Sequence, residues 1–247
     1  MRVLLLGGTT EASAMAQRLS QTGIETVFSY AGRTRAPMPQ PLPTRIGGFG
    51  GVAGLATYLN AEAITHVIDA THPFAAGMSR NSVAACAQTG TSLIRLERAP
   101  WMAQAGDSWT KVNRVEDMPD ALPDTPARVF LAIGKQQIGL FSVKPQHHYV
   151  LRLVDAPIAP LPLPHATVVL ARGPFTVQGD AALMREHRIT HVLAKNAGGM
   201  AAQAKLEAAR ALRLPVIMAA RPTLPGATLE SVDAVMEWLG HSALRGV

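Results

Sequence analysis

Short runs of aliphatic residues alternate along the chain with longer stretches in which apolar and polar residues recur at helical spacing. The apolar runs predict buried strands at residues 3–6, 26–30, 44–46, 66–70 and 93–96, and again at 129–133, 149–154, 167–171, 191–195 and 216–219. Helical spacing occurs between them, at 11–21, 52–59, 79–88, 179–187 and 201–212. Near-continuous apolar strands are typical of a parallel sheet that is covered on both faces. The alternation therefore predicts an α/β fold.

The two series of elements repeat one another. Ile64-Thr65-His66-Val67 returns as Ile189-Thr190-His191-Val192, and a proline-spaced loop follows the second strand of each half. Arg98-Ala99-Pro100 follows the fifth strand, and Arg221-Pro222 follows its counterpart. These repeats predict two Rossmann-like domains with parallel sheets, residues 1–124 and 125–247, related by internal duplication. We expect them to face a central cleft, because ligands bind beyond the carboxyl ends of parallel strands.

Composition narrows the classes of protein to consider. With 247 residues, of which 48% are hydrophobic, the chain can fill a core, which excludes intrinsic disorder. No apolar run is long enough to span a membrane. The single cysteine, Cys86, excludes an intramolecular disulfide and a cysteine-cluster metal site. We therefore expect a cytoplasmic protein with no membrane partner and no metal.

The chain is basic, with a formal charge of +6. Such a balance suits a polyanionic partner, although it is also typical of a surface charge without a specific role. The basic residues are dispersed, and aromatic residues make up only 5%. Because a nucleic-acid surface combines a basic groove with stacking aromatics, we expect no nucleic-acid partner. A small polyanion remains as the alternative.

The loop Gly7-Gly8-Thr9-Thr10-Glu11 ends the first predicted strand and opens the first predicted helix. Glycines there let the backbone approach a phosphate, which the free N–H groups of the helix terminus can bind. The spacing differs from the dinucleotide fingerprint, and a tight turn with a threonine cap would have the same sequence. The position in a first βα unit favours anion binding.

Two arginines, Arg33 and Arg35, follow the second predicted strand. In nucleotide-binding sheets an acidic residue at this place holds the ribose 2′-hydroxyl of NAD, whereas an arginine accommodates the 2′-phosphate of NADP. The loop therefore favours NADPH, with two solvent-exposed arginines as the alternative.

Ionisable residues also stand at other strand ends. Asp69-Ala70-Thr71-His72-Pro73 ends the fourth strand, where catalysis and a structural turn are equally compatible with the residues. In the second half, Lys195-Asn196-Ala197-Gly198-Gly199 ends the equivalent strand. A lysine at the end of a buried strand needs a partner or a ligand, which favours a ligand contact. Gly134-Lys135 and Arg172-Gly173 add cations at two further strand ends.

Taken together, these motifs resemble the precorrin-6A reductase family of cobalamin biosynthesis, including its cobalt-precorrin relatives. The resemblance covers almost the whole chain, and its most specific string is Asp69-Ala70-Thr71-His72-Pro73-Phe74-Ala75. The other matching strings are Leu5-Leu6-Gly7-Gly8-Thr9-Thr10-Glu11, Ala31-Gly32-Arg33, Glu97-Arg98-Ala99-Pro100-Trp101, Arg172-Gly173-Pro174-Phe175, Lys195-Asn196-Ala197-Gly198-Gly199 and Arg221-Pro222.

The resemblance implies an NADPH-dependent reduction of the C18=C19 double bond of precorrin-6A to give precorrin-6B. Hydride would pass from the nicotinamide to C19 and a proton to C18, and the product would pass to neighbouring corrin-pathway enzymes. The residues expected to bind the cofactor are Gly7, Gly8, Thr9, Thr10, Glu11, Arg33 and Arg35. Those expected to bind the polycarboxylated tetrapyrrole are Thr71, His72, Arg80, Lys135, Arg172, Gly173, Lys195, Asn196, Gly198 and Gly199.

Asp69, His72 and Lys195 are the ionisable candidates for catalysis. We expect His72 and Lys195 mainly to bind substrate, because a substrate carboxyl or water can also deliver the proton. Two other functions fit a chain of two Rossmann-like halves. One is a glycosyltransferase that uses a nucleotide sugar, and the other is a non-catalytic NADPH-binding regulator.

Overall fold

The computed structural model describes residues 1–32 and 37–244, which form two compact units. The first unit comprises Met1–Ala99 and Pro222–Val247, and the second comprises Pro100–Arg221. The chain therefore passes from one unit to the other twice, at Ala99–Pro100 and at Arg221–Pro222. None of the helices in the described part of the chain is long and apolar enough to cross a membrane.

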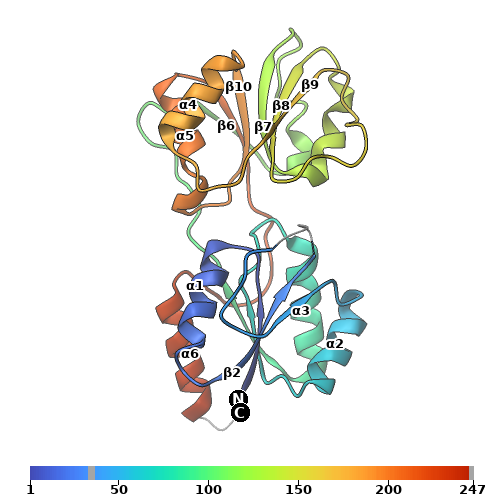
Figure 1. The fold of residues 1–247 in the computed structure, drawn as a ribbon, viewed down its shortest axis with the longest axis vertical. Helices are drawn as coiled ribbons and strands as arrows, with labels where there is room; N and C mark the ends of the chain where they lie inside the picture. Colours follow the sequence, from blue (N-terminus) through green and yellow to red (C-terminus); the bar gives the residue numbers. More distant parts are fainter. Residues whose placement is uncertain (33–36, 245–247) are drawn as a thin grey trace. The chain divides into compact units, whose positions relative to one another are not determined.

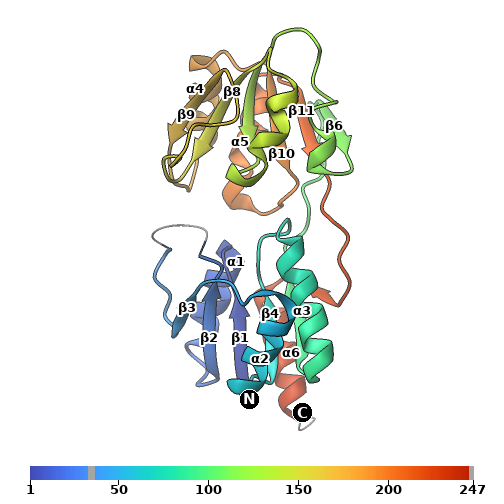
Figure 2. The ribbon, with the colours of Figure 1, turned by 90° about the vertical axis from the view of Figure 1, so that its right-hand side faces the viewer.

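The first unit is built on a six-stranded parallel sheet of order β12-β5-β4-β1-β2-β3. Its strands are β1 (Arg2–Leu6), β2 (Glu25–Tyr30), β3 (Thr44–Ile46), β4 (His66–Asp69), β5 (Ser92–Leu96) and β12 (Thr228–Leu229). Helices α1 (Thr10–Leu19) and α6 (Val232–Leu244) cover one face, and α2 (Gly51–Ala61) and α3 (Ala76–Thr89) cover the other (Figures 1 and 2). Successive residues of β1 alternate between these layers, because Val3 and Leu5 pack with α1 and α6 whereas Leu4 and Leu6 pack with α2 and α3.

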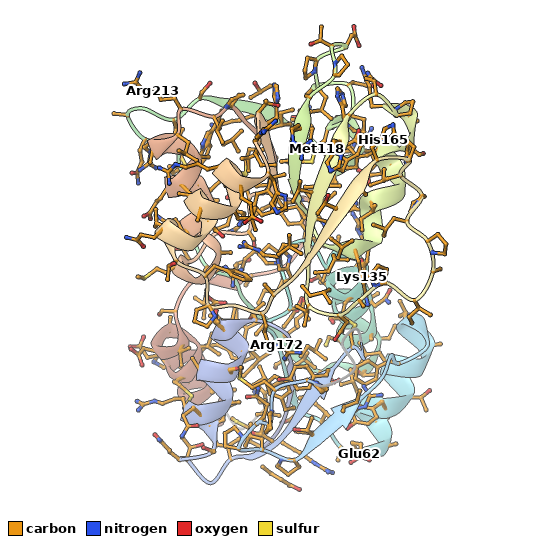
Figure 3. The ribbon with its side chains drawn as sticks, turned by 45° about the horizontal axis from the view of Figure 1, so that its top comes forward. Glu62, Met118, Lys135, His165, Arg172 and Arg213 are labelled. Carbon is orange, nitrogen blue, oxygen red and sulfur yellow. The ribbon has the colours of Figure 1, made fainter. Side chains whose placement is uncertain are left out.

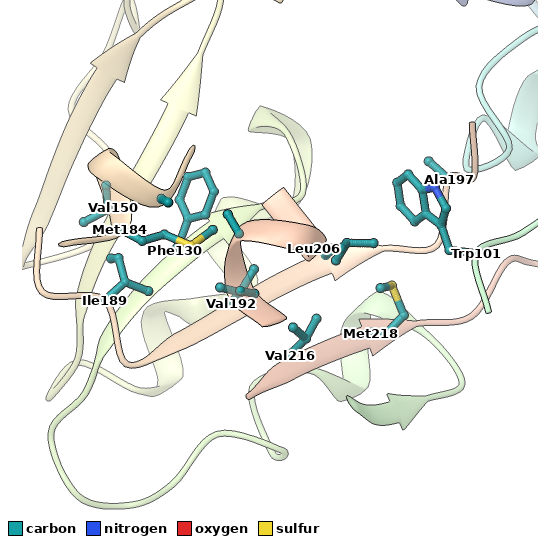
Figure 4. Packing of buried hydrophobic residues seen from close by; sticks show 14 residues of the cluster. Trp101, Phe130, Val150, Met184, Ile189, Val192, Ala197, Leu206, Val216 and Met218 are labelled. Carbon is teal, nitrogen blue, oxygen red and sulfur yellow. The ribbon is translucent and has the colours of Figure 1, made fainter. Parts of the chain in front are cut away.

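The second unit has a six-stranded parallel sheet of order β6-β11-β10-β7-β8-β9. Its strands are β6 (Trp109–Val112), β7 (Arg128–Ala132), β8 (His148–Leu153), β9 (Ala166–Leu170), β10 (His191–Lys195) and β11 (Val216–Ala219). Helices α4 (Val177–Glu186) and α5 (Ala204–Ala211) pack on one face through a cluster centred on Phe130, Val192 and Leu206 (Figure 4). On the other face, Phe141 of the 3₁₀ helix η2 (Lys135–Val143) packs against Tyr149, with ring centroids 5.7 Å apart. The remaining short helices are η1 (Val115–Asp117) and η3 (Met200–Ala202).

Both sheets have the strand order 3-2-1-4-5-6 of a Rossmann fold when their strands are numbered along each repeat. The sixth strand, however, is exchanged between the repeats. β6 follows β5 in the chain but pairs with β11, and β12 follows β11 but pairs with β5. Each sheet therefore consists of five strands from one repeat and one strand from the other.

This exchange makes the compact units differ from the predicted division into residues 1–124 and 125–247. Residues 100–124 belong to the second unit, and residues 222–247 return to the first. The predicted boundary follows the repeat in the sequence, whereas the compact units follow strand pairing. The exchanged strands gave no clear apolar run, because β6 reads Trp-Thr-Lys-Val and β12 contains two residues.

Four histidines make the stability of the fold depend on pH. Burial lowers the pKa of His66, His147, His148 and His191 below the ordinary value of 6.5. The unfolded chain then binds more protons than the folded one as pH falls below about 6.5. The contribution of these histidines to the free energy of unfolding is therefore fully present above that pH and is lost as pH falls below it. We expect the melting temperature measured by circular dichroism to be lower at about pH 5 than at about pH 7.5.

The variant His147→Gln provides the comparison, because His147 is fully buried and its Nδ1 accepts a hydrogen bond from the Ala127 amide at 3.1 Å. A glutamine can accept the same bond without titrating. The difference in melting temperature between the two pH values should become smaller in the variant. An equal or higher melting temperature of the wild type at the acidic pH would contradict this account.

Candidate functional site

Each sheet has a topological switch point, where two adjacent central strands continue into connections that run in opposite directions. In the first unit this point lies between β1 and β4, and in the second between β7 and β10. Ligands of open parallel sheets bind in the crevice beyond the carboxyl ends of such strands. Gly7–Glu11 and Gly134-Lys135 follow β1 and β7, whereas Asp69–His72 and Lys195–Gly199 begin with the last residues of β4 and β10.

The loop after β1 combines a tightly packed glycine with an open one. A Cβ on Gly7 would lie 2.0 Å from Cζ of the Phe28 ring, so only glycine fits there. Gly8 has φ +129°, and a Cβ there would meet nothing within 4 Å. Thr9 is the N-cap of α1, and its Oγ accepts a hydrogen bond from the Ala12 amide at 3.1 Å. The loop thus brings the N-terminus of a helix next to open space, an arrangement that accommodates a phosphate.

Two contacts fix this loop and neutralise its acidic residue. The Thr9 hydroxyl donates to the Ala70 carbonyl at 2.8 Å, which joins the loop after β1 to the end of β4. The Glu11 carboxylate forms an ion pair with Arg98. Because Arg98 balances this charge, Glu11 opposes the approach of an anion less than an isolated carboxylate would. The structure thus gives Glu11 a protein partner.

The ends of β2 and β3 carry three arginines, of which the structure describes Arg45. Arg33 and Arg35, expected to hold a 2′-phosphate, lie outside the described residues. After β3, the Arg45 guanidinium lies 3.8 Å from the centroid of the Phe49 ring and donates to the Ser29 hydroxyl at 2.9 Å. Arg45 therefore links β2 and β3, a contact that the sequence did not reveal.

Asp69 is buried, and its side chain stabilises the turn that follows β4. Its Oδ1 accepts hydrogen bonds from the Thr71 amide at 3.1 Å and from the Thr71 hydroxyl at 2.6 Å. Its Oδ2 lies 3.9 Å from Nε of Arg95, which stands opposite in the register of β5. These partners favour the structural alternative for both residues, because the Thr71 hydroxyl donates to the protein and the Asp69 carboxylate is 3% exposed.

His72 and Arg80 are exposed at the same end of the first unit. The Phe74 amide donates to Nδ1 of His72 at 3.2 Å, so in the neutral ring Nε2 carries the hydrogen. Arg80 lies in the second turn of α3, which follows this loop. His72 can thus present a hydrogen-bond donor, and Arg80 a cation, to an anionic ligand.

Lys195 is half-buried at the end of β10. Burial lowers the pKa of its ammonium group below the ordinary 10.5, and the negative charge of Glu116 partly opposes this shift. A desolvated cation of this kind gains from pairing with an anion. Lys195 therefore remains a candidate for binding a carboxylate.

The rest of this loop is held by Trp101 and Arg221. The Asn196 side chain accepts from the Trp101 amide at 2.8 Å and donates to the Trp101 carbonyl at 2.9 Å. The Trp101 indole donates to the Gly199 carbonyl at 2.9 Å, and Arg221 donates to the carbonyls of Asn196 and Ala197. Asn196, expected to bind substrate, thus uses its amide group within the protein. Gly198 and Gly199 have φ +66° and +75°, values that favour glycine.

Lys135 is exposed at the start of η2, which follows β7, and Arg172 is exposed in the loop after β9 (Figure 3). Next to Arg172 and Gly173, the Phe175 ring packs on the Arg152 guanidinium, 3.4 Å from the ring centroid. Arg152 also forms a buried ion pair with Asp180 of α4. The pair fixes the loop that carries Arg172. Sequence reasoning missed it, because Arg152 and Asp180 belong to different elements and neither stands in a motif.

No group of three or more histidine, cysteine, aspartate or glutamate side chains suitable for a metal occurs among the described residues. The candidate residues of the first unit are glycines, hydroxyls and a helix N-terminus together with His72 and Arg80, whereas those of the second are the cations Lys135, Arg172 and Lys195.

Comparison with known proteins points to one family. The sequence model of a family described as "Precorrin-6x reductase CbiJ/CobK" matches residues 2–240. A precorrin-6A reductase of Rhodobacter capsulatus is 64% identical over 249 residues, which cover 100% of this chain and 99% of that protein. A precorrin-6A reductase of Sinorhizobium sp is 47% identical over 245 residues, which cover 96% of this chain and 94% of that protein.

A solved structure described as "CobK precorrin-6A reductase" is 64% identical to this chain and superimposes with a TM-score of 0.94. The superposition covers 98% of this chain and 96% of that one. It confirms the predicted α/β fold with two Rossmann-like domains.

Proposed function

This chain belongs to the precorrin-6x reductase CbiJ/CobK family, and we propose that it reduces precorrin-6A in cobalamin biosynthesis with NADPH as the hydride donor. The observation that carries the proposal is the family match over residues 2–240, which includes every described residue expected to bind cofactor or substrate. In the proposed reaction C19 receives the hydride and C18 a proton, so that the C18=C19 double bond of precorrin-6A is reduced to give precorrin-6B.

We assign the cofactor's phosphates to the loop after β1. Gly8 leaves open space there, Thr9 caps α1, and the Glu11 carboxylate is balanced by Arg98. Amides at the start of α1 would bind a phosphate, whereas the Thr10 hydroxyl, also expected to bind the cofactor, donates to the Glu11 carboxylate at 3.1 Å. Arg33 and Arg35 would pair with the 2′-phosphate, because an arginine at the end of the second strand accommodates NADP. The bound nicotinamide would supply the hydride, whereas the protein would orient the nicotinamide against the substrate and provide the electrostatic environment.

We assign the carboxylates of the tetrapyrrole to Arg80, Lys135, Arg172 and Lys195. Arginine forms bidentate hydrogen bonds with a carboxylate, which would fix the orientation of the ring, whereas lysine acts as a point charge. His72 would add a hydrogen-bond donor through Nε2. Asp69 would position the turn rather than deliver the proton, because it is buried and accepts two hydrogen bonds from Thr71.

The proposed activity is tested by supplying purified protein with precorrin-6A and either NADPH or NADH. We expect oxidation of NADPH in step with loss of precorrin-6A, slower reaction with NADH, and a smaller preference in Arg33→Ala. Binding of a UDP-sugar in place of NADPH would favour the glycosyltransferase. Binding of NADPH without turnover of precorrin-6A would favour the non-catalytic regulator.

The variant Lys195→Met separates substrate binding from proton transfer. Loss of one charge-assisted hydrogen bond, worth about 1.5–3 kcal/mol, should raise KM for precorrin-6A roughly 10–100-fold. Binding of NADPH, measured by calorimetry, should stay unchanged. If turnover fell more than about a thousandfold at unchanged substrate affinity, Lys195 would instead be the general acid.

A further inference from the structure

Two large apolar side chains are exposed beside the loop that carries Lys195. Met102 is 70% exposed and Met200 is 90% exposed. The Trp101 indole donates a hydrogen bond to the Gly199 carbonyl at 2.9 Å. Met102 directly follows Trp101 in the chain, and Met200 directly follows Gly199. The backbone therefore brings the two methionines to the same place, beyond the carboxyl end of β10.

The segments that carry these methionines are held in place. Trp101 is 9% exposed, and both its amide and its carbonyl are hydrogen-bonded to the Asn196 side chain. The Lys205 ammonium lies 4.9 Å from the centroid of the Trp101 ring. The side chains of Met102 and Met200 are thus presented to solvent from a fixed backbone. Methionine is suited to contact with an irregular apolar surface, because its side chain is flexible and polarizable.

Cationic residues lie at the same edge of the sheet as the methionines. Lys195 directly precedes Asn196, and Lys135 follows β7, the strand that pairs with β10. The edge thus offers an apolar surface together with positive charges. A ligand complementary to it has an extended apolar face and several carboxylates at its rim. That description fits a polycarboxylated tetrapyrrole, whereas a simple polyanion lacks the apolar face and a nucleotide lacks the carboxylates.

We propose that Met102 and Met200 form a contact surface for one face of the tetrapyrrole macrocycle, while the neighbouring cations bind its carboxylates. The proposal rests on the proposed function, whose substrate it places on the second unit. Met102 and Met200 would make apolar contact with the carbon framework of the macrocycle, and the cations would bind the carboxylates at its periphery.

Two probes distinguish the apolar contact from the charge contact. Uroporphyrin is a tetrapyrrole with eight carboxylates, and mellitate carries six carboxylates on a single benzene ring. Binding of each is measured by calorimetry for wild type, for M102Q/M200Q and for Lys195→Met. Because the macrocycle would remove the two methionine side chains from water, we expect M102Q/M200Q to bind uroporphyrin at least roughly tenfold more weakly. Binding of mellitate should be unchanged in M102Q/M200Q, whereas Lys195→Met should weaken both probes.

Val143→Gln is the matched control. Val143 is 68% exposed, close to the value for Met102, but it ends η2 ahead of the amino end of β8. We expect this variant to bind both probes as the wild type does, and we expect the melting temperatures of Val143→Gln and M102Q/M200Q to stay unchanged. A loss of uroporphyrin binding in Val143→Gln equal to that in M102Q/M200Q would overturn the proposal.

The assay with precorrin-6A separates failure of this inference from failure of the proposed function. M102Q/M200Q should show a raised KM for precorrin-6A. If wild type reduces precorrin-6A and the double variant has the same KM and the same uroporphyrin affinity, the contact surface is wrong and the function stands. If wild type does not reduce precorrin-6A but binds uroporphyrin through the methionines, the function is wrong and the surface stands.

A dimer that becomes a monomer in M102Q/M200Q, measured by sedimentation, would show that a second copy covers the methionines and would overturn the proposal.

Discussion

Asp180→Ala is expected to destabilise the protein by about 3–5 kcal/mol, because it leaves the Arg152 guanidinium buried without its charge partner. The side chains of Asp180 and Arg152 are only 2% and 12% exposed, so water cannot replace the lost carboxylate. The measurement is the free energy of unfolding from urea denaturation. We also expect a raised KM for precorrin-6A, since Arg152 packs on Phe175 and so holds the loop of Arg172.

Two further variants test the reason for this effect. Asp124→Ala removes the partner of Lys144, but Asp124 is 95% exposed, so its loss should leave the free energy of unfolding unchanged. The double variant Arg152→Met and Asp180→Leu removes both buried charges and should recover most of the stability, because an apolar pair of similar volume often replaces a buried ion pair at little cost. If Asp180→Ala were as stable as the wild type, the pair would not be buried in solution as it is here.

Gly7→Ala is expected to weaken the binding of NADPH strongly. The added Cβ would lie 2.0 Å from the Phe28 ring, and overpacking of this kind costs about 1–3 kcal/mol of stability. Movement of Phe28 or of the loop would also displace the amides after Gly8 from the proposed phosphate site. Loss of one charge-assisted hydrogen bond there, worth about 1.5–3 kcal/mol, corresponds to roughly 10–100-fold weaker binding, measured by calorimetry.

Gly77→Ala is the matched control for this variant. Gly77 lies in α3, and a Cβ there would meet nothing within 4 Å. Alanine is the better helix former by about 0.8–1 kcal/mol, so stability should rise and NADPH affinity should stay unchanged. Equal NADPH affinity in Gly7→Ala and wild type would mean that the cofactor phosphates lie elsewhere.

The central strands were predictable because each is a short apolar run buried on both faces. Residues 3–6 and 191–195 of the sequence correspond closely to β1 and β10. The exchanged strands and α6 were not predicted. A strand of two residues such as β12 is defined by its partner β5 and not by its own side chains. The position of the boundary between the compact units depends on this pairing and therefore escaped the repeat pattern.

The candidate site was predictable only as a set of strand ends. Topology places Gly8 and His72 beyond central strands and Lys195 at the end of one, where the sequence pattern also put them. What each polar group contacts depends on residues far along the chain. Asn196 is hydrogen-bonded to Trp101, which lies in a segment that carries no apolar pattern. Sequence alone therefore identified the loops, whereas the structure shows which of their side chains are used within the protein.

The exchange of the sixth strand also sets the order in which the chain can fold during synthesis. Residues 100–221 are continuous, so the second unit has all of its strands before the last residues leave the ribosome. The first unit begins the chain but lacks β12 and α6 until residues 228–244 have been synthesised, and Val235 and Leu239 of α6 complete its core. In this protein the amino-terminal sheet is therefore the last to be completed, the reverse of the usual order in which amino-terminal domains fold first.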